Sequence, residues 1–413
     1  MTDLKRQLRA LYFTRFANSF GYVTLLTLLP FYVNELGATG VTVGLFATGL
    51  TAAQGVAVIP ITWAGDRHDK RTILLAGIAL AMLVYGAFTL VATSTQFILV
   101  RMVQGVAATA SGILGLSLIG QLARESERAN TIGKSNSWRF AAGIGGTLSA
   151  GALYQAFGFT VVFALLTLIA GVAFLAVWLF VEPDETTVEG FAFTDLALNR
   201  RILTITSFRA QYAVAVTLVR TWVPLFAGVT AAQGGLAFGG IAVAVVTAAE
   251  KFTNMLSQPY TGRLSDRFGR ARFVFVGGLA YGVVALVVPF TPAIGSALGL
   301  PASLPLLGNL TPAFLPLVVL NGLLGVADSI REPASMALFA DEGSGSGVAS
   351  SFGVRDIVWR PGAILAPLAG GWIMQNVGMQ WVFFTGAIAA FTGVAAFLGI
   401  LSYSHGRGAL TQW

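Results

Sequence analysis

The sequence predicts an all-α integral membrane protein of twelve transmembrane helices, arranged as two pseudo-symmetric six-helix bundles. Three observations carry this prediction: the composition, a series of long apolar runs and an internal repeat. Of the 413 residues, 55% are hydrophobic and only 10% are charged, whereas a soluble domain carries roughly 25% charged residues. So few charges cannot cover a water-exposed surface of this size, which excludes a soluble enzyme.

Cysteine is absent, and the chain has only two histidines, His68 and His405. The missing cysteines exclude a disulfide framework, a thiolate metal site and a cysteine nucleophile. Both histidines fall in polar segments, which excludes a histidine-lined metal centre inside the membrane. We therefore expect neither a metal site nor a cofactor.

Twelve runs have the length of about 20 apolar residues that a membrane helix needs. The tenth is the least apolar, because its second half carries Asp328, Arg331, Glu332 and Pro333. The runs are Leu11–Val33, Val41–Trp63, Ile73–Ala92, Phe97–Gln121, Ile132–Tyr154, Phe159–Val181, Leu203–Val229, Leu236–Tyr260, Phe273–Thr291, Phe314–Phe339, Phe352–Met374 and Met379–Tyr403.

The basic residues predict the topology. The amino end, the loops after helices 2, 4, 6 and 8 and the tail together hold sixteen Lys or Arg, and the alternate loops hold none. This asymmetry places both termini in the cytoplasm of a multi-pass plasma-membrane protein. It also explains the formal net charge of +7 without a nucleic-acid patch. No small-residue cleavage site follows the first run, so we expect it to remain as helix 1.

Three pairs of matching segments reveal the repeat. They are Arg15 and Pro30 with Arg209 and Pro224, Asp66-Arg67 with Asp266-Arg267, and Gly146–Gly151 with Ala366–Gly371, at offsets of 194, 200 and 220. The order is conserved between the copies and six is even, so both copies share one orientation. We predict an N-terminal bundle at 1–181, a cytoplasmic linker at 182–201 and a C-terminal bundle at 202–413. A short surface helix is expected at Phe193–Asn199.

Four motifs resemble those of the major facilitator superfamily of secondary transporters. The segment Gly262–Arg272 fits the loop signature G-x-L-x-D-R-x-G-R-x-R, and a degraded copy after helix 2 has Thr62 and Asp69 in place of the two glycines. Residues 101–105 read R-x-x-Q-G. Helix 5 resembles the antiporter motif G-P-x-x-G-G with Thr147 in place of proline, and helix 11 keeps Pro367–Gly371. The resemblance implies a 6+6 transporter fold similar to drug–proton antiporters, and it implies a coupling role for Arg101 and Gln104.

The loops after helices 2 and 8 are candidate cytoplasmic gates, formed by Asp66, Arg67, Asp266, Arg267 and Arg270. Each aspartate can face the positive amino end of helix 5 or helix 11 in the other half. Such a contact would exist only when the cytoplasmic side is closed. The alternative is that these residues only anchor the topology, which we favour for the arginines.

Helices 5 and 11 carry small residues at four-residue spacing, a pattern that lets two backbones approach closely in lipid. The candidate residues for packing between the bundles are Gly146, Ala150, Gly151, Ala366, Pro367, Gly370 and Gly371. Their matching place in both repeats suggests a moving interface. Static packing within a bundle is the alternative.

Nine basic and four acidic residues fall inside the predicted spans. Each would cost about 2.5–3.5 kcal/mol in lipid at mid-bilayer, so together they predict a polar path through the protein.

Asp356 and Arg360 can pair one turn apart, and Arg331 and Glu332 are further candidates for structural ion pairs. The candidates for proton coupling or the substrate cavity are Arg101, Gln104, Arg220, Glu250 and Asp328. Glu250 and Asp328 lie near mid-membrane, where burial favours the protonated form of a carboxylate. Alternatively, each is the neutralised partner of a nearby cation, such as Arg331 for Asp328.

We therefore expect a secondary active transporter that works by alternating access. No G-x-x-x-x-G-K-[ST] loop is present, so direct drive by ATP is not expected.

Proton-coupled efflux of small amphipathic compounds is the leading hypothesis. The alternative is uptake or exchange of a small organic anion or other metabolite, since the charges within the spans sum to +5. A non-transporting receptor or scaffold is the alternative of another class, and an enzyme is not expected. The expected partners are a small-molecule substrate, protons and lipid, but no nucleic acid, and we expect a monomer.

Overall fold

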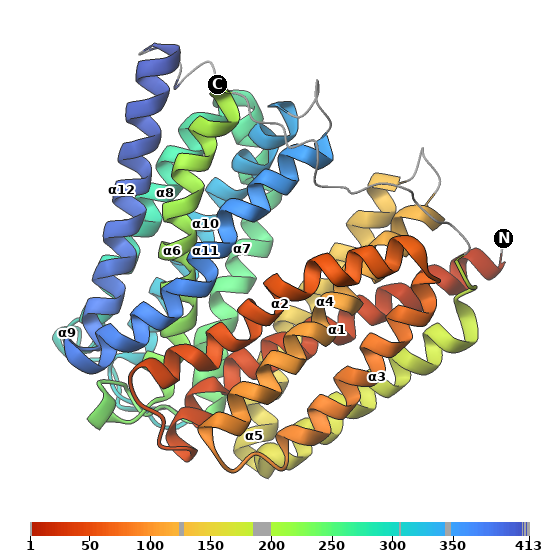
Figure 1. Cartoon of the computed structure of the whole chain (residues 1–413). Coiled ribbons are helices and arrows are strands. Elements are labelled where there is room, and N and C mark those ends of the chain that lie inside the picture. Colours follow the sequence, from red (N-terminus) through yellow and green to blue (C-terminus); the bar gives the residue numbers. More distant parts are fainter. Residues whose placement is uncertain are drawn as a thin grey trace. The chain divides into compact units, whose positions relative to one another are not determined.

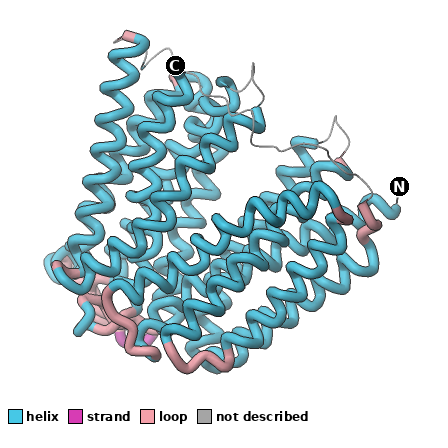
Figure 2. The backbone as a smooth tube through the Cα atoms, viewed as in Figure 1, coloured by secondary structure: helices cyan, strands magenta, loops and turns pink. Residues whose placement is uncertain are grey.

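The computed structural model describes residues 2–123, 128–184, 200–304, 307–342, 348–406, 408 and 410. Helices make up nearly all of this part (Figures 1 and 2). The only strands in it are β1 (Ser303–Leu304) and β2 (Gly308–Asn309), which form a short antiparallel pair.

Twelve α-helices and two 3-10 turns lie in the described residues. The helices are α1 (Thr2–Glu35), α2 (Val41–Arg67), α3 (Lys70–Phe88), α4 (Ser94–Leu122), α5 (Arg128–Phe180), α6 (Arg200–Gly228), α7 (Gly240–Phe268), α8 (Arg270–Val287), α9 (Thr291–Ala297), α10 (Phe314–Glu342), α11 (Val348–Asn376) and α12 (Met379–His405). The turns are η2 (Ala231–Gln233) and η3 (Val288–Phe290). The sequence did not predict η2, α9 or the two strands.

The predicted fold class is confirmed, with one difference in how the helices divide. Predicted helices 5 and 6 join into α5, which kinks at Gly158 with φ 72° and ψ −169°. Nine helical stretches of the described chain are long and apolar enough to cross a membrane. With the two arms of α5 counted separately, and with the more polar α6 and α7 added, these become the twelve predicted spans. Helix α10 continues through Pro333 to Glu342.

The contacts divide the chain into two units, Met1–Ala38 with Leu45–Phe191, and Thr39–Gly44 with Ala192–Trp413. In the first unit, α1 packs against α4 and α5, and α3 packs against the same two helices. In the second unit, α6 packs against α11 and α12, α7 against α10, and α8 against α10 and α12. Most of the predicted linker, including Phe193–Asn199, lies outside the described residues, and the predicted domain boundaries stay a prediction.

Each unit contains the same close approach between two helices. A Cβ atom at Gly105 of α4 would lie 2.5 Å from the carbonyl oxygen of Leu50 in α2. A Cβ atom at Gly325 of α10 would lie 2.1 Å from the carbonyl oxygen of Glu250 in α7. The two pairs are related by the repeat offsets 200 and 220. The glycine of the R-x-x-Q-G motif therefore allows the backbones of α2 and α4 to touch, and Gly325 does the same in the second unit.

Candidate functional site

Three helices of the second unit bring one arginine between two carboxylates. Arg220 of α6 donates from Nε to Glu250 of α7 at 2.7 Å and from Nη2 to Asp328 of α10 at 2.8 Å. The Glu250 side chain is 11% exposed and that of Asp328 is 5% exposed, while the Arg220 side chain is 40% exposed. Both acids are thus held within the unit, and the guanidinium between them keeps an accessible face.

Polar side chains fix the two helices that carry the acids. Thr253 of α7 donates its hydroxyl to the Gly322 carbonyl of α10 at 2.6 Å. From the other side, the Asn321 amide donates to the Val246 carbonyl at 2.6 Å. The Asn254 amide donates to the Gly325 carbonyl at 3.2 Å and also lies 3.4 Å from Asp328 Oδ2. These contacts set the register of α7 against α10 and place Glu250 beside Asp328.

The ion pairs continue from Asp328 along α10 to α11. Arg331 donates from Nη2 to Asp328 Oδ1 at 2.6 Å and to Glu332 Oε2 at 2.6 Å. Arg355 of α11 pairs with the other oxygen of Glu332. Together with Arg220 and Glu250, these residues form what we call the six-charge cluster: three arginines against three carboxylates. It is electrically neutral when all six groups are ionised, so an added proton or ion changes its net charge.

In the first unit, Arg101 is buried beside polar groups that carry no charge. It donates from Nε to the Phe46 carbonyl of α2 at 3.1 Å and from Nη1 to Gln104 Oε1 at 2.8 Å. Gln104 in turn makes a side-chain hydrogen bond with the hydroxyl of Tyr85 in α3. Within the part of the chain that the structure describes, no carboxylate forms an ion pair with Arg101. The two arginines that the sequence singled out, Arg101 and Arg220, therefore lie in different units and in opposite electrostatic settings.

Four of the predicted gating residues contact side chains within four positions of them in the sequence. Asp266 pairs with Arg270 one turn later at 2.8 Å. Arg67 lies over the ring of Trp63 at 4.9 Å, and Arg267 over the neighbouring Phe268 ring at 5.4 Å. The docking of Asp66 and Asp266 onto helices of the other half stays a prediction.

Asp69, which replaces the second glycine of the loop signature, gives the first loop a different structure. Its carboxylate caps α3 by accepting from the backbone N–H groups of Arg71 and Thr72, and it also accepts from the backbone N–H of Asp184 at 2.8 Å. Lys70 pairs with the Asp184 carboxylate at 2.6 Å. Burial alone would raise the pKa of Asp69, but these hydrogen bonds outweigh it and lower that pKa below its usual value. The replacement therefore ties the segment after α5 to the turn between α2 and α3.

The small residues predicted to pack between the bundles lie on α5 and α11, and those described next contact helices of their own unit. A Cβ atom at Gly146 would lie 2.7 Å from Val23 of α1, and one at Gly370 would lie 2.5 Å from the Trp222 ring of α6. Ala150 and Ala366 are also buried. These contacts lie within one unit each, as static packing would require. A moving interface between the bundles, with Gly151, Pro367 and Gly371, stays a prediction. Asp356 and Arg360 pair at 2.9 Å on one partly exposed face of α11.

Sequence reasoning missed Tyr85 and Asn254. Asn254 lies one turn after Glu250, so its place on the same face of α7 was readable from the spacing. Tyr85 carries no comparable signal, because its contact with Gln104 crosses from α3 to α4. Among the described residues, no group of three or more His, Asp or Glu could hold a metal ion.

Comparison with known proteins agrees with the predicted fold. The sequence matches the model of the Major Facilitator Superfamily over residues 11–294 and 247–409. Multidrug resistance protein MdtG of Salmonella paratyphi A (strain ATCC 9150 / SARB42) is 23% identical over 418 residues, covering 98% of this chain and 96% of that protein. Multidrug transporter protein MdtP of Bacillus subtilis (strain 168) is 28% identical over 170 residues, or 41% of this chain. That match spans only 27% of the length of MdtP.

Two solved structures share the fold. One is a POT family transporter in complex with 5-aminolevulinic acid, with a TM-score of 0.74 and 13% identity, covering 97% of this chain and 96% of that one. The other is a bacterial homolog to the human lysosomal transporter Spinster, with a TM-score of 0.67 and 16% identity, covering 99% and 97%. At these identities the likeness extends to the fold.

Proposed function

Because the chain belongs to the Major Facilitator Superfamily, a family of membrane transporters, we propose that it exports small amphipathic compounds from the cell in exchange for protons, by alternating access. The observation that carries the proposal is Arg220, whose accessible guanidinium is held by two carboxylates from different helices. The multidrug transporters MdtG and MdtP, at low identity, support the same direction of transport.

Exchange follows from the charge of the six-charge cluster. Since three arginines oppose three carboxylates, one added proton and one added organic cation each raise its net charge by one. The two additions therefore oppose each other, and a proton that arrives from outside favours release of the cation. Two ligands that compete for one state of the site are exchanged and do not travel together.

Glu250 is the better proton acceptor of the two candidates. Asp328 accepts from both Arg220 and Arg331, and the Arg331 side chain is only 2% exposed. Protonation of Asp328 would remove one of the two negative charges that neutralise the buried Arg331 guanidinium, which is costly. In the described residues Glu250 forms an ion pair with Arg220 alone, and Arg220 keeps Asp328 when Glu250 is neutral. We assign the exchanged proton to Glu250 and a structural role to Asp328.

Uptake or exchange of a small organic anion is the second candidate. The exposed face of Arg220 supports it, because a guanidinium binds a carboxylate through two parallel hydrogen bonds. In this case protonation of Glu250 would recruit the anion, and proton and substrate would move in the same direction. The direction of substrate flux under a pH gradient therefore separates the two candidates.

The test is reconstitution in liposomes with an imposed pH gradient, a panel of cationic dyes and small organic anions, and parallel runs with a protonophore. We expect uphill movement of a dye against the proton flow, abolished by the protonophore. Glu250→Gln should lose the uphill movement but keep exchange of labelled for unlabelled dye. Asp356→Asn is the control, because Asp356 forms a partly exposed pair elsewhere on the unit.

Two outcomes contradict the proposal. Uphill movement by Glu250→Gln at the normal rate and with the normal pH dependence removes Glu250 from coupling. Binding of a dye without flux in any condition favours the receptor or scaffold alternative.

A further inference from the structure

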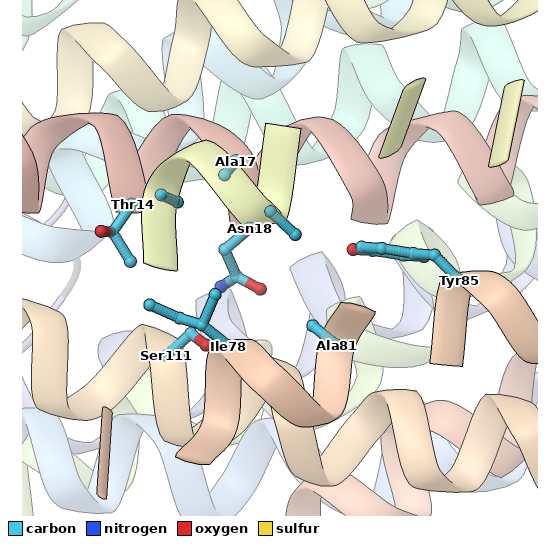
Figure 3. A pocket seen from close by; sticks show the side chains of 9 residues that line it. Thr14, Ala17, Asn18, Ile78, Ala81, Tyr85 and Ser111 are labelled. Atoms are coloured by element: carbon cyan, nitrogen blue, oxygen red, sulfur yellow. The ribbon is translucent and has the colours of Figure 1, made fainter. Parts of the chain in front are cut away.

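The first unit contains a small cavity with a partly polar lining that the transport proposal does not use. It has a volume of about 20 Å³ and lies where α1, α3, α4 and α5 meet (Figure 3). Its polar lining comes from Thr14 and Asn18 of α1, Tyr85 of α3 and Ser111 of α4. The rest of the lining is aliphatic and consists mainly of alanine.

The repeat shows what fills the corresponding place in the second unit. Gly77 of α3 packs against Ser111, and Gly277 of α8 packs against Arg331. The offsets are 200 and 220, as in the repeat. Ser111 in the first unit therefore occupies the position of Arg331 in the second.

Three neighbours of these positions differ in the same sense, whereas Ile78 and Tyr85 are larger than their counterparts Gly278 and Ala285. Thr14, Asn18 and Ala81 around the cavity correspond to Phe208, Tyr212 and Tyr281, through the offsets 194 and 200. In the second unit, the Arg331 guanidinium lies 4.1 Å from the centre of the Tyr212 ring and 6.0 Å from that of Phe208. At all four positions the first unit carries the smaller side chain. The cavity is thus the place that Arg331 and its aromatic neighbours fill in the other copy.

The size and lining of the cavity select its occupant. A water molecule needs about 10–15 Å³ of such volume and two to four polar partners, and the cavity offers both. The Asn18 amide already donates to the Ala108 carbonyl at 3.3 Å, so the groups open to an occupant are the Asn18 carbonyl oxygen and the Tyr85 O–H, which water satisfies and an apolar ligand does not. A metal cation would meet no carboxylate in the lining and would lie near Arg15, which donates to the Gly112 carbonyl beside Ser111.

Tyr85 connects the cavity to Arg101. Gln104 accepts from Arg101 through Oε1, which leaves its amide N–H to donate to the Tyr85 oxygen. The Tyr85 O–H is then free to donate in its turn, and Figure 3 shows this hydroxyl pointing toward the cavity. A water between Tyr85 and Asn18 would complete a chain of hydrogen bonds that ends on Arg101.

We propose that this cavity binds one or two structural water molecules, which take the place of the Arg331 side chain of the second unit and make Tyr85 a positioning residue for Arg101. The water site stands without the transport proposal, whereas the effect of Tyr85 on coupling rests on it. The two parts therefore need separate measurements.

The water site is tested by crystal structures of the full chain and of two variants at one position, at a resolution that shows ordered water. Ala81→Val places methyl groups in the cavity, and Ala81→Ser places a hydroxyl there; the two residues have similar helix propensity. We expect density within hydrogen-bond distance of Tyr85 Oη and Asn18, retained in Ala81→Ser and lost in Ala81→Val. The thermal midpoint should fall for valine relative to serine. A well-ordered map without this density, or a higher midpoint for valine, overturns the proposal.

The positioning role is tested by the pH profile of transport in Tyr85→Phe. The variant keeps the ring but breaks the chain, so the profile should shift while the thermal midpoint changes little. Tyr154→Phe is the control, because the Tyr154 ring packs against Phe31 and Phe159 near the last turns of α1. A Tyr85→Phe profile that superimposes on that of the unmodified protein overturns the role. If no proton-driven transport exists at all, the water density still decides the first part.

Discussion

Gly325 lies directly against the backbone of Glu250. A Cβ atom at position 325 would come within 2.1 Å of the Glu250 carbonyl oxygen and within 2.3 Å of the Thr253 hydroxyl. Only a glycine lets α10 approach α7 closely enough for Glu250 and Asp328 to reach the same guanidinium. The geometry of the candidate site thus depends on a residue that carries no functional group.

Replacement of Gly325 by alanine should therefore both destabilise the protein and disturb the site. Forcing a methyl group into a packed contact costs about 1–3 kcal/mol, which exceeds the roughly 1 kcal/mol that alanine gains over glycine in a helix. Thermal unfolding in detergent should show a lower midpoint for Gly325→Ala. Gly322→Ala is the control, since its nearest contact is Thr253 at 3.4 Å. Equal midpoints for the two variants would contradict this account.

The fold was predictable because its determinants are local or additive. The apolar runs and the charge of alternate loops can be found along the chain without knowledge of any long-range contact, and the repeat offsets were visible in Arg15, Pro30 and their counterparts. The sequence also separated the two arms of α5, with one run ending at Tyr154 and the next beginning at Phe159, and the structure places the kink between them at Gly158, which adopts positive φ as does Gly378 at the equivalent position. The hairpin of β1 and β2 lacked a periodic signal, because two-residue strands show no alternation.

The candidate site was predictable only in part, because its contacts join residues far apart in sequence. Glu250 and Asp328 were identified from the cost of charge in lipid, and that argument also required partners for them. It did not indicate that Arg220 serves both. The spacing of Asp328 and Arg331 favoured their pairing, which the structure contains. The cavity beside Tyr85 was beyond prediction, since a space between helices has no sequence of its own.

Removal of Arg331 should be among the most destabilising single changes in the second unit. Arg331→Met leaves Asp328 and Glu332 with one arginine fewer, in a place that excludes water. Breaking a buried ion pair from one side costs about 3–5 kcal/mol. The comparison is Arg360→Met, whose partner Asp356 is 59% exposed and whose loss should have a small effect. We would measure both by denaturant unfolding in mixed micelles. A smaller loss for Arg331→Met than for Arg360→Met would show that the cluster is not structural.

Asp69 predicts a pH dependence of stability with a definite sign. Its folded-state pKa lies below the usual value, because the carboxylate accepts from the backbone of Asp184 and from Thr72. The stabilisation is therefore fully present above the unfolded pKa of about 3.9 and is lost as the pH falls through the lower folded value. The advantage of the unmodified protein over Asp69→Asn should be constant near neutral pH and shrink below about pH 4.

Thr72→Val refines the measurement on Asp69. This variant removes the hydroxyl that donates to the carboxylate at 2.6 Å but keeps the backbone N–H that also donates. As the pH is lowered, the stability of Thr72→Val should fall less steeply than that of the unmodified protein. If the stability advantage of the unmodified protein over Asp69→Asn grew on acidification, the pKa of Asp69 would be raised in the folded state and the assignment would be wrong.

Gly21 and Tyr85 should behave as one energetic unit. A Cβ atom at Gly21 would lie 1.8 Å from the Tyr85 hydroxyl oxygen and 2.6 Å from the ring carbon that bears it. Gly21→Ala alone should therefore cost about 1–3 kcal/mol. In a Tyr85→Leu background both clashing atoms are absent, so the same change should become neutral or stabilising. Gly86→Ala is the control, because its Cβ would meet nothing within 4 Å, and its effect should be the same in both backgrounds. A double-mutant cycle of thermal midpoints measures the coupling. A coupling near zero would mean that the Tyr85 hydroxyl does not lie against Gly21, and it would remove the support that α1 gives to the chain from Tyr85 through Gln104 to Arg101.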